Sequence, residues 1–127
     1  MSNDEILTKL KEIKIENYIW IIYIGIIFLS WYSNSLEKDY LINKDVNSKK
    51  KYRYIMITIF SILIIVYLYF LYDSYKSLKE LDPRSSNKKK NLVFLSFLSS
   101  LLITVSGLIF LYIAYKDEDL NVEIAFN

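Results

Sequence analysis

The segment Tyr54 to Tyr72, YIMITIFSILIIVYLYFLY, decides the fold of this chain. Its 19 residues carry no charged side chain, and its polar groups are Thr58, Ser61 and the tyrosine hydroxyls. A helix of a soluble bundle, which is the alternative, needs a polar stripe toward water, and this segment has none. Because a hydrocarbon core about 30 Å thick takes roughly 20 helical residues, the segment predicts a transmembrane helix.

Two further uncharged runs flank this segment, at residues 18–32 and 92–115, and they are 15 and 24 residues long. The longer run can cross a bilayer with some tilt. The shorter run has Trp20 near one end and Trp31 at the other, which suits the two membrane interfaces. The sequence therefore predicts an all-α membrane protein with three transmembrane helices in an antiparallel up-down-up bundle, forming a single domain over residues 1–127.

The first run raises a second alternative, because its length and the polar residues after it also fit a cleaved signal peptide. The segment before it is long for such a peptide and contains the acidic residues Asp4, Glu5, Glu12 and Glu16. The early region of a signal peptide is short and positively charged. We therefore expect the first span to be retained.

The helices are expected to continue beyond the three runs. Ser2 or Asn3 can cap a helix whose first turn holds Asp4 and Glu5, as the helix dipole favours. Residues 43–51 are rich in Asn, Ser, Asp and Lys and predict a solvated turn region. Pro83 cannot continue the helical hydrogen bonds, so residues 82–87 predict a tight connection between the second and third helices.

The composition excludes much of enzyme chemistry. The chain has no Cys and no His, which removes thiolate nucleophiles, soft zinc sites and imidazole bases. Its glycines, Gly25 and Gly107, lie inside spans rather than in a phosphate-binding loop, and no span contains an ionisable group of the kind that marks a transport pathway. The acidic residues 117–119 lack the pattern of a calcium loop and predict solvated charge. We expect no catalytic residue, no cofactor and no metal.

The third run contains a stripe of small and hydroxylated residues. Its members are Ser96, Ser100, Thr104, Gly107 and Ala114, separated by four, four, three and seven positions. Such a stripe lets a neighbouring helix approach closely and offers hydrogen bonds between helices. It predicts a helix-packing face, which serves the monomer in the simpler interpretation and joins copies of the chain in the other.

A buried polar cluster is expected from the depths of Tyr23, Tyr67 and Ser100. Counted from the midpoints of their spans, these residues lie about 3, 6 and 5 Å toward the same side of the bilayer if the helices are antiparallel. A phenol at that depth needs a partner for its hydroxyl, because water is not available there. The alternative is that each hydroxyl bonds a carbonyl of its own helix or reaches toward the interface.

The positive charges favour one orientation by a narrow margin. Residues 1–17 and 73–91 contain nine Lys and Arg, whereas residues 33–53 and 116–127 contain seven. Because Lys and Arg accumulate in cytoplasmic loops, the N-terminus is expected in the cytoplasm and the C-terminus outside. The near balance leaves insertion in both orientations open.

The sequence thus predicts a multi-pass integral membrane protein that acts through helix packing, as an interaction or accessory protein. Its expected partners are the lipid bilayer and either further copies of itself or another membrane protein. A net charge of +2 gives no reason to expect nucleic acid. In size, in having three spans and in its charged tail the chain resembles phage holins. That resemblance implies the alternative function of an oligomeric, pore-forming membrane protein.

Overall fold

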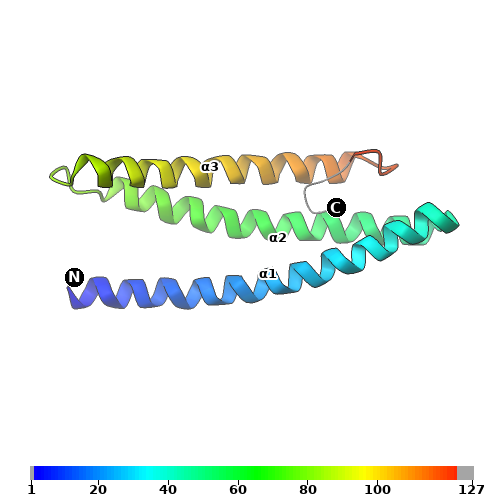
Figure 1. Ribbon diagram of the computed structural model, residues 1–127, viewed down its shortest axis with the longest axis horizontal. Helices are drawn as coiled ribbons and strands as arrows, with labels where there is room; N and C mark the ends of the chain where they lie inside the picture. The colour runs from blue at the N-terminus through cyan, green and yellow to red at the C-terminus, as the bar shows by residue number, and fades with distance from the viewer. Residues whose placement is uncertain (1, 123–127) are drawn as a thin grey trace.

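The computed structural model describes residues 2–122, and these form three helices and no strand. They are α1 (Asn3–Asn43), α2 (Val46–Lys79) and α3 (Asn87–Lys116), and they run antiparallel in the predicted up-down-up order (Figure 1). Each is long and apolar enough to cross a membrane, which supports a multi-pass membrane protein. At 1.5 Å per residue they measure about 60, 50 and 45 Å, so all three continue past a hydrocarbon core about 30 Å thick.

A side-chain oxygen caps the first turn of each helix. Ser2 Oγ accepts a hydrogen bond from the Glu5 amide at 3.2 Å, as one of the two predicted caps would. Asp45 accepts from the Asn47 amide at 3.0 Å, and Ser86 Oγ accepts from the Lys89 amide at 3.2 Å. Such caps satisfy amides that have no partner inside the helix, and they set where each helix begins.

The predicted turn region at residues 43–51 is wrong in extent, because α2 already begins at Val46. The connection consists of Lys44, which has a left-handed backbone with φ 56°, and Asp45, which caps α2. The Lys44 amide donates to the Tyr40 carbonyl at 2.8 Å, and this bond closes α1. The polar residues that follow belong to the first turns of α2.

The second connection agrees with its prediction. Helix α2 ends at Lys79, and the predicted residues 82–87 contain the turn and the first residue of α3. Asp82 organises this turn, because its carboxylate accepts from the Arg84 amide at 2.9 Å and its carbonyl accepts from the Ser85 amide at 2.9 Å.

Helix α2 lies between the other two helices (Figure 1). Both α1 and α3 pack against it, whereas no Cα atom of α1 comes within 8 Å of a Cα atom of α3 within residues 2–122. The most deeply buried apolar side chains, Met56, Ile59 and Phe60, accordingly belong to α2. Phe60 stacks on Phe110 of α3 with 5.6 Å between the ring centroids. The core is therefore centred on α2.

The outer helices meet α2 through residues spaced by seven. Ile19, Ile26 and Ser33 are buried on α1, and Gly107 and Ala114 are buried on α3. A contact that repeats every 3.5 residues is the packing of left-handed coiled coils. Ser33 is fully buried, with its Oγ 2.7 Å from the Ser30 carbonyl and 3.7 Å from Met56 Sδ. A small side chain at this position allows α1 and α2 to approach closely.

Candidate functional site

The predicted small-residue stripe of α3 lies largely at the contact with α2. Thr104, Gly107 and Ala114 are buried, Ser100 is partly buried and Ser96 is exposed. A Cβ atom at Gly107 would stand 3.1 and 3.2 Å from ring carbons of Tyr67. The hydroxyl of Thr104 donates to the Ser100 carbonyl at 2.7 Å and lies 3.5 Å from the Tyr67 carbonyl. The structure therefore places four of the five residues at or beside an intramolecular interface.

Ser96 falls outside this contact because the observed face follows a different spacing. The less exposed positions of α3 include Lys90, Phe110 and Ile113 and, along one face, Val93, Phe97, Ser100, Thr104, Gly107, Leu111 and Ala114. The residues along this face alternate steps of four and three, which keeps a 3.5-residue repeat on one side of the helix. Two successive steps of four, as from Ser96 to Thr104, drift away from such a seam. Phe97 is the apolar residue that a strict seven-residue repeat would have selected.

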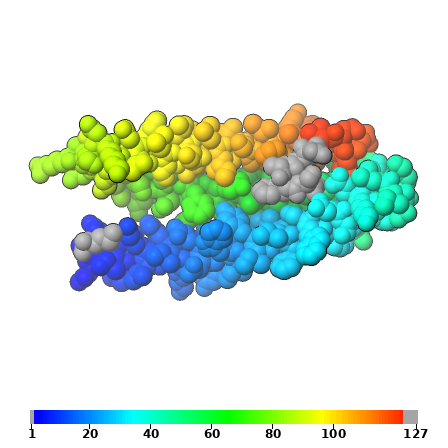
Figure 2. All heavy atoms as spheres, in the orientation of Figure 1, coloured from blue at the N-terminus to red at the C-terminus, as the bar shows by residue number. Residues whose placement is uncertain are grey.

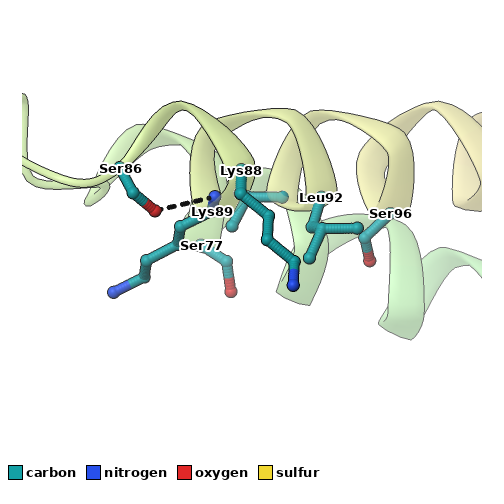
Figure 3. A pocket seen from close by; sticks show the side chains of 7 residues that line it. Ser77, Ser86, Lys88, Lys89, Leu92 and Ser96 are labelled. Carbon is teal, nitrogen blue, oxygen red and sulfur yellow. Dashed lines mark hydrogen bonds between the residues drawn. The ribbon is translucent and has the colours of Figure 1, made fainter.

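Ser96 instead lines a groove of about 390 Å³ near the α2–α3 connection. The other lining residues shown in Figure 3 are Ser77, Ser86, Lys88, Lys89 and Leu92. Ser86 Oγ is engaged by the Lys89 amide, and the two lysine side chains extend away from each other (Figure 3). Lysines beside the start of an apolar run suit the headgroup level of a bilayer, where they act as interface anchors.

Tyr23, Tyr67 and Ser100 are the members of the predicted polar cluster. Both tyrosines pack against the core around α2. No hydrogen bond joins the three side chains within the part of the chain that the structure describes. The carbonyl of Ser100 accepts a hydrogen bond from the Thr104 hydroxyl within the same helix. A cluster held together by their hydroxyls stays a prediction.

The end of the bundle beside the α1–α2 turn carries polar contacts that sequence reasoning missed. Arg53 donates through Nη2 to the Tyr115 carbonyl at 2.9 Å, in the last turn of α3. This bond satisfies one of the carbonyls that a helix end leaves without an intrahelical partner. The only signal in the sequence is the position of Arg53, one residue before an uncharged run. The bond fixes the start of the second span against the end of the third.

Two neighbouring contacts strengthen this end. Lys49 Nζ forms an ion pair with Asp119 at 3.1 Å and lies 5.3 Å from the centre of the Tyr40 ring. The bond to Asp119 raises the pKa of Lys49, so the amine stays charged. Burial of the Tyr52 phenol, and then the negative charge of Glu37, raise the pKa of Tyr52. Polar groups of all three helices thus meet where the chain leaves the apolar runs.

Asp39 organises the α1–α2 turn. Its carboxylate accepts from Ser48 Oγ at 2.6 Å and from Asn43 Nδ2 at 2.6 Å. These hydrogen bonds, with Ser48 contributing most, hold the pKa of Asp39 below its usual value. A lowered pKa means that the ionised carboxylate favours the folded turn.

We therefore expect the turn to weaken in acid. The stabilisation from Asp39 is complete above the unfolded-state pKa of about 3.9 and is lost as the pH falls through the lower folded-state pKa. Amide exchange of residues 44–48, corrected for intrinsic rates, should show less protection at pH 3 than at pH 6. Asp39→Asn should remove most of this difference, whereas Asp4→Asn, far from the turn, should retain it. An unchanged difference in Asp39→Asn would contradict the assignment.

The opposite end of the α1–α2 contact carries charges of both signs. Burial raises the pKa of Glu12, and the negative charges of Asp73 and Glu16 raise it further, whereas the positive charges of Lys76 and Lys9 lower it. In Figure 1 the ribbons of α1 and α2 cross near their turn and separate toward the N-terminus. The hydrogen bond from Ser48 of α2 to Asp39 of α1 joins the two helices at the turn end.

Two acidic side chains after α3 form polar contacts, those of Asp117 and Asp119. Asp117 accepts from the amides of Asn121 and Val122, at 2.9 and 2.7 Å. Asp119 pairs with Lys49, as described above. These bonds fold the start of the tail back on the helix end, and the rest of the tail lies outside the described residues.

The chain matches no protein-family model, no curated protein and no solved structure. A functional proposal therefore depends on the arrangement of its own residues.

Proposed function

We propose that this multi-pass membrane protein is a non-enzymatic interaction or accessory protein, which packs its helices against another membrane protein or a further copy. The observation that carries the proposal is the one-sided packing of α1, which lies along one edge of the bundle (Figure 2) and whose Cα atoms come within 8 Å of α2 but not of α3 in the described chain. A helix held on one side offers most of its surface to a partner. The proposal also accounts for a chain whose spans contain no ionisable group.

The exposed surface of α1 carries apolar side chains both within its uncharged run and before it. Trp20, Ile24 and Ile27 are exposed inside the run, where lipid tails also cover such side chains. Ile6 and Leu10 are exposed as well, although they precede the run and alternate with charged residues. This setting differs from that of an uncharged span, so these side chains support an interaction with protein.

Photo-cross-linking in native membranes tests the proposal. A photoreactive amino acid at Ile27, on the exposed side of α1, is expected to give a discrete protein adduct. The same amino acid at Ile59, which is fully buried in α2, should give none beyond the chain itself. Adducts with lipid alone at Ile27 would argue against an interaction protein.

The orientation of the chain is a separate prediction of this proposal. Nine positive residues on one side and seven on the other favour a cytoplasmic N-terminus and an exterior C-terminus. Reporter fusions at the two ends should show activity of a cytoplasmic reporter only at the N-terminus. A cytoplasmic C-terminus would remove this orientation, and equal activity on both sides would indicate insertion in both directions.

A pore formed by several copies is the second candidate. The observation in its favour is that Ser99 and Ser106, seven residues apart, are exposed on α3, where hydroxyls of adjacent copies would line a polar path. Purified protein in vesicles would then release a trapped dye, and Ser99→Leu with Ser106→Leu would reduce the release. Intact vesicles at high protein density would exclude this function.

A further inference from the structure

Helix α1 carries a second apolar stripe besides the one that meets α2. Its members, which we call the outer stripe, are Ile6, Leu10, Ile13, Asn17, Trp20, Ile24, Ile27 and Trp31. They alternate steps of four and three without interruption, and all eight are exposed. This is the repeat with which one helix packs along another in a coiled coil.

The outer stripe is distinct from the contact with α2. Trp20 and Ile27 each follow by one residue a side chain buried against α2, namely Ile19 and Ile26. One residue corresponds to about 100° around a helix. The outer stripe therefore lies well around the helix from α2, and a further helix can occupy it while the present fold is kept.

Asn17 is the one polar member of the outer stripe. Its amide is exposed and makes no side-chain hydrogen bond within residues 2–122. A single Asn at a core position of a coiled coil lowers stability but fixes register, because it pairs with a polar group at the same height. An Asn within an otherwise apolar repeat therefore favours a partner with a defined alignment over lipid.

The charges beside the outer stripe discriminate between partners. With Leu10 and Asn17 at a positions and Ile13 at d, Lys9 and Glu16 fall at g positions and Lys14 at an e position. In a parallel pair each g side chain faces the e side chain five residues further along the partner. In two copies of this chain, Lys9 would therefore face Lys14, and the pair would repel. Charge complementarity requires carboxylates on the partner helix opposite Lys9 and Lys14.

We propose that the outer stripe binds one helix of a different membrane protein, parallel to α1, with Asp or Glu opposite Lys9 and Lys14 and a polar side chain opposite Asn17. The partner helix continues past the bilayer, as α1 does, because Ile6 and Leu10 extend the stripe beyond the uncharged run. This inference rests on the proposed function and names the surface and the partner chemistry.

Two synthetic transmembrane peptides test the proposal against the full-length protein in phosphatidylcholine vesicles. Both have an apolar heptad repeat with one Asn at the height of Asn17; one has Glu at the two flanking positions and the other has Lys. Energy transfer between labelled protein and labelled peptide should show about tenfold tighter binding of the Glu peptide, from two attractive pairs replacing two repulsive ones. Lys9→Glu with Lys14→Glu should reverse this preference.

Matched variants locate the binding surface. Ile13 and Ile15 are exposed to similar extents, 50% and 42%, but Ile15 lies outside the outer stripe. Ile13→Lys should abolish binding of the Glu peptide, and Ile15→Lys should leave it unchanged. Three results would overturn the proposal. The two peptides could bind equally well, or Ile13→Lys and Ile15→Lys could weaken peptide binding equally. Energy transfer between copies of the protein could also occur and be abolished by Ile13→Lys. If the Ile27 adduct with protein persists in that case, the proposed function stands and only the partner chemistry is wrong.

Discussion

Replacing Gly107 by Ile is expected to be the most damaging single substitution in α3. A Cβ atom at this position already approaches ring carbons of Tyr67 to 3.1 and 3.2 Å, and Ile adds three more carbon atoms in the same space. Overpacking a close contact costs about 1–3 kcal/mol, and a rigid aromatic ring gives little room for relaxation. Thermal aggregation in detergent should therefore begin at a clearly lower temperature than for the unchanged protein.

Two other substitutions in α3 serve as comparisons for Gly107→Ile. Ser100→Ile should act in the same direction but less strongly, because Ser100 is only partly buried. Leu101→Ile conserves volume at a side chain that is 38% exposed, so its effect should be small. If Leu101→Ile proved the most damaging of the three, the small-residue face would not be the packing contact.

The spans and the polar turn beside Pro83 were predictable because they depend on local features of the chain. An uncharged run of sufficient length, a capping Ser2 and a proline each act through the backbone of their own segment. The short α1–α2 turn was not predictable, because Lys44 takes a left-handed backbone conformation. Sequence patterns assign that conformation to Gly or Asn. The stability of the turn comes from side chains around it, above all from Asp39 and Ser48.

The sequence did not predict that α2 lies between α1 and α3, and the reason is different. None of the three runs has a charged residue on any side, so hydrophobic periodicity does not mark which faces meet protein and which meet lipid. Small residues are the remaining signal, and of these the structure buries Thr104, Gly107 and Ala114 and leaves Ser96 exposed. The bond from Arg53 to the Tyr115 carbonyl joins residues far apart in the chain, and no local pattern indicates it.

Replacing Ser33 by Leu is expected to release α1 from α2 while α2 and α3 stay together. Ser33 is fully buried, and its Oγ lies 3.7 Å from Met56 Sδ, so a larger side chain has no space. Overpacking of about 1–3 kcal/mol acts here on a helix whose Cα atoms come within 8 Å of α2 but not of α3 in residues 2–122. Amide exchange in detergent should therefore accelerate in residues 26–40 and remain slow in α3.

Ser35→Leu is the matched control, because Ser35 lies two residues further along the same helix and is exposed. It adds the same apolar volume on a side of α1 that does not meet α2, so exchange should hardly change. Equal acceleration in the two variants would mean that leucine perturbs α1 itself rather than its contact with α2. Acceleration in α3 as well would mean that the three helices unfold as one unit, which their separate contacts with α2 argue against.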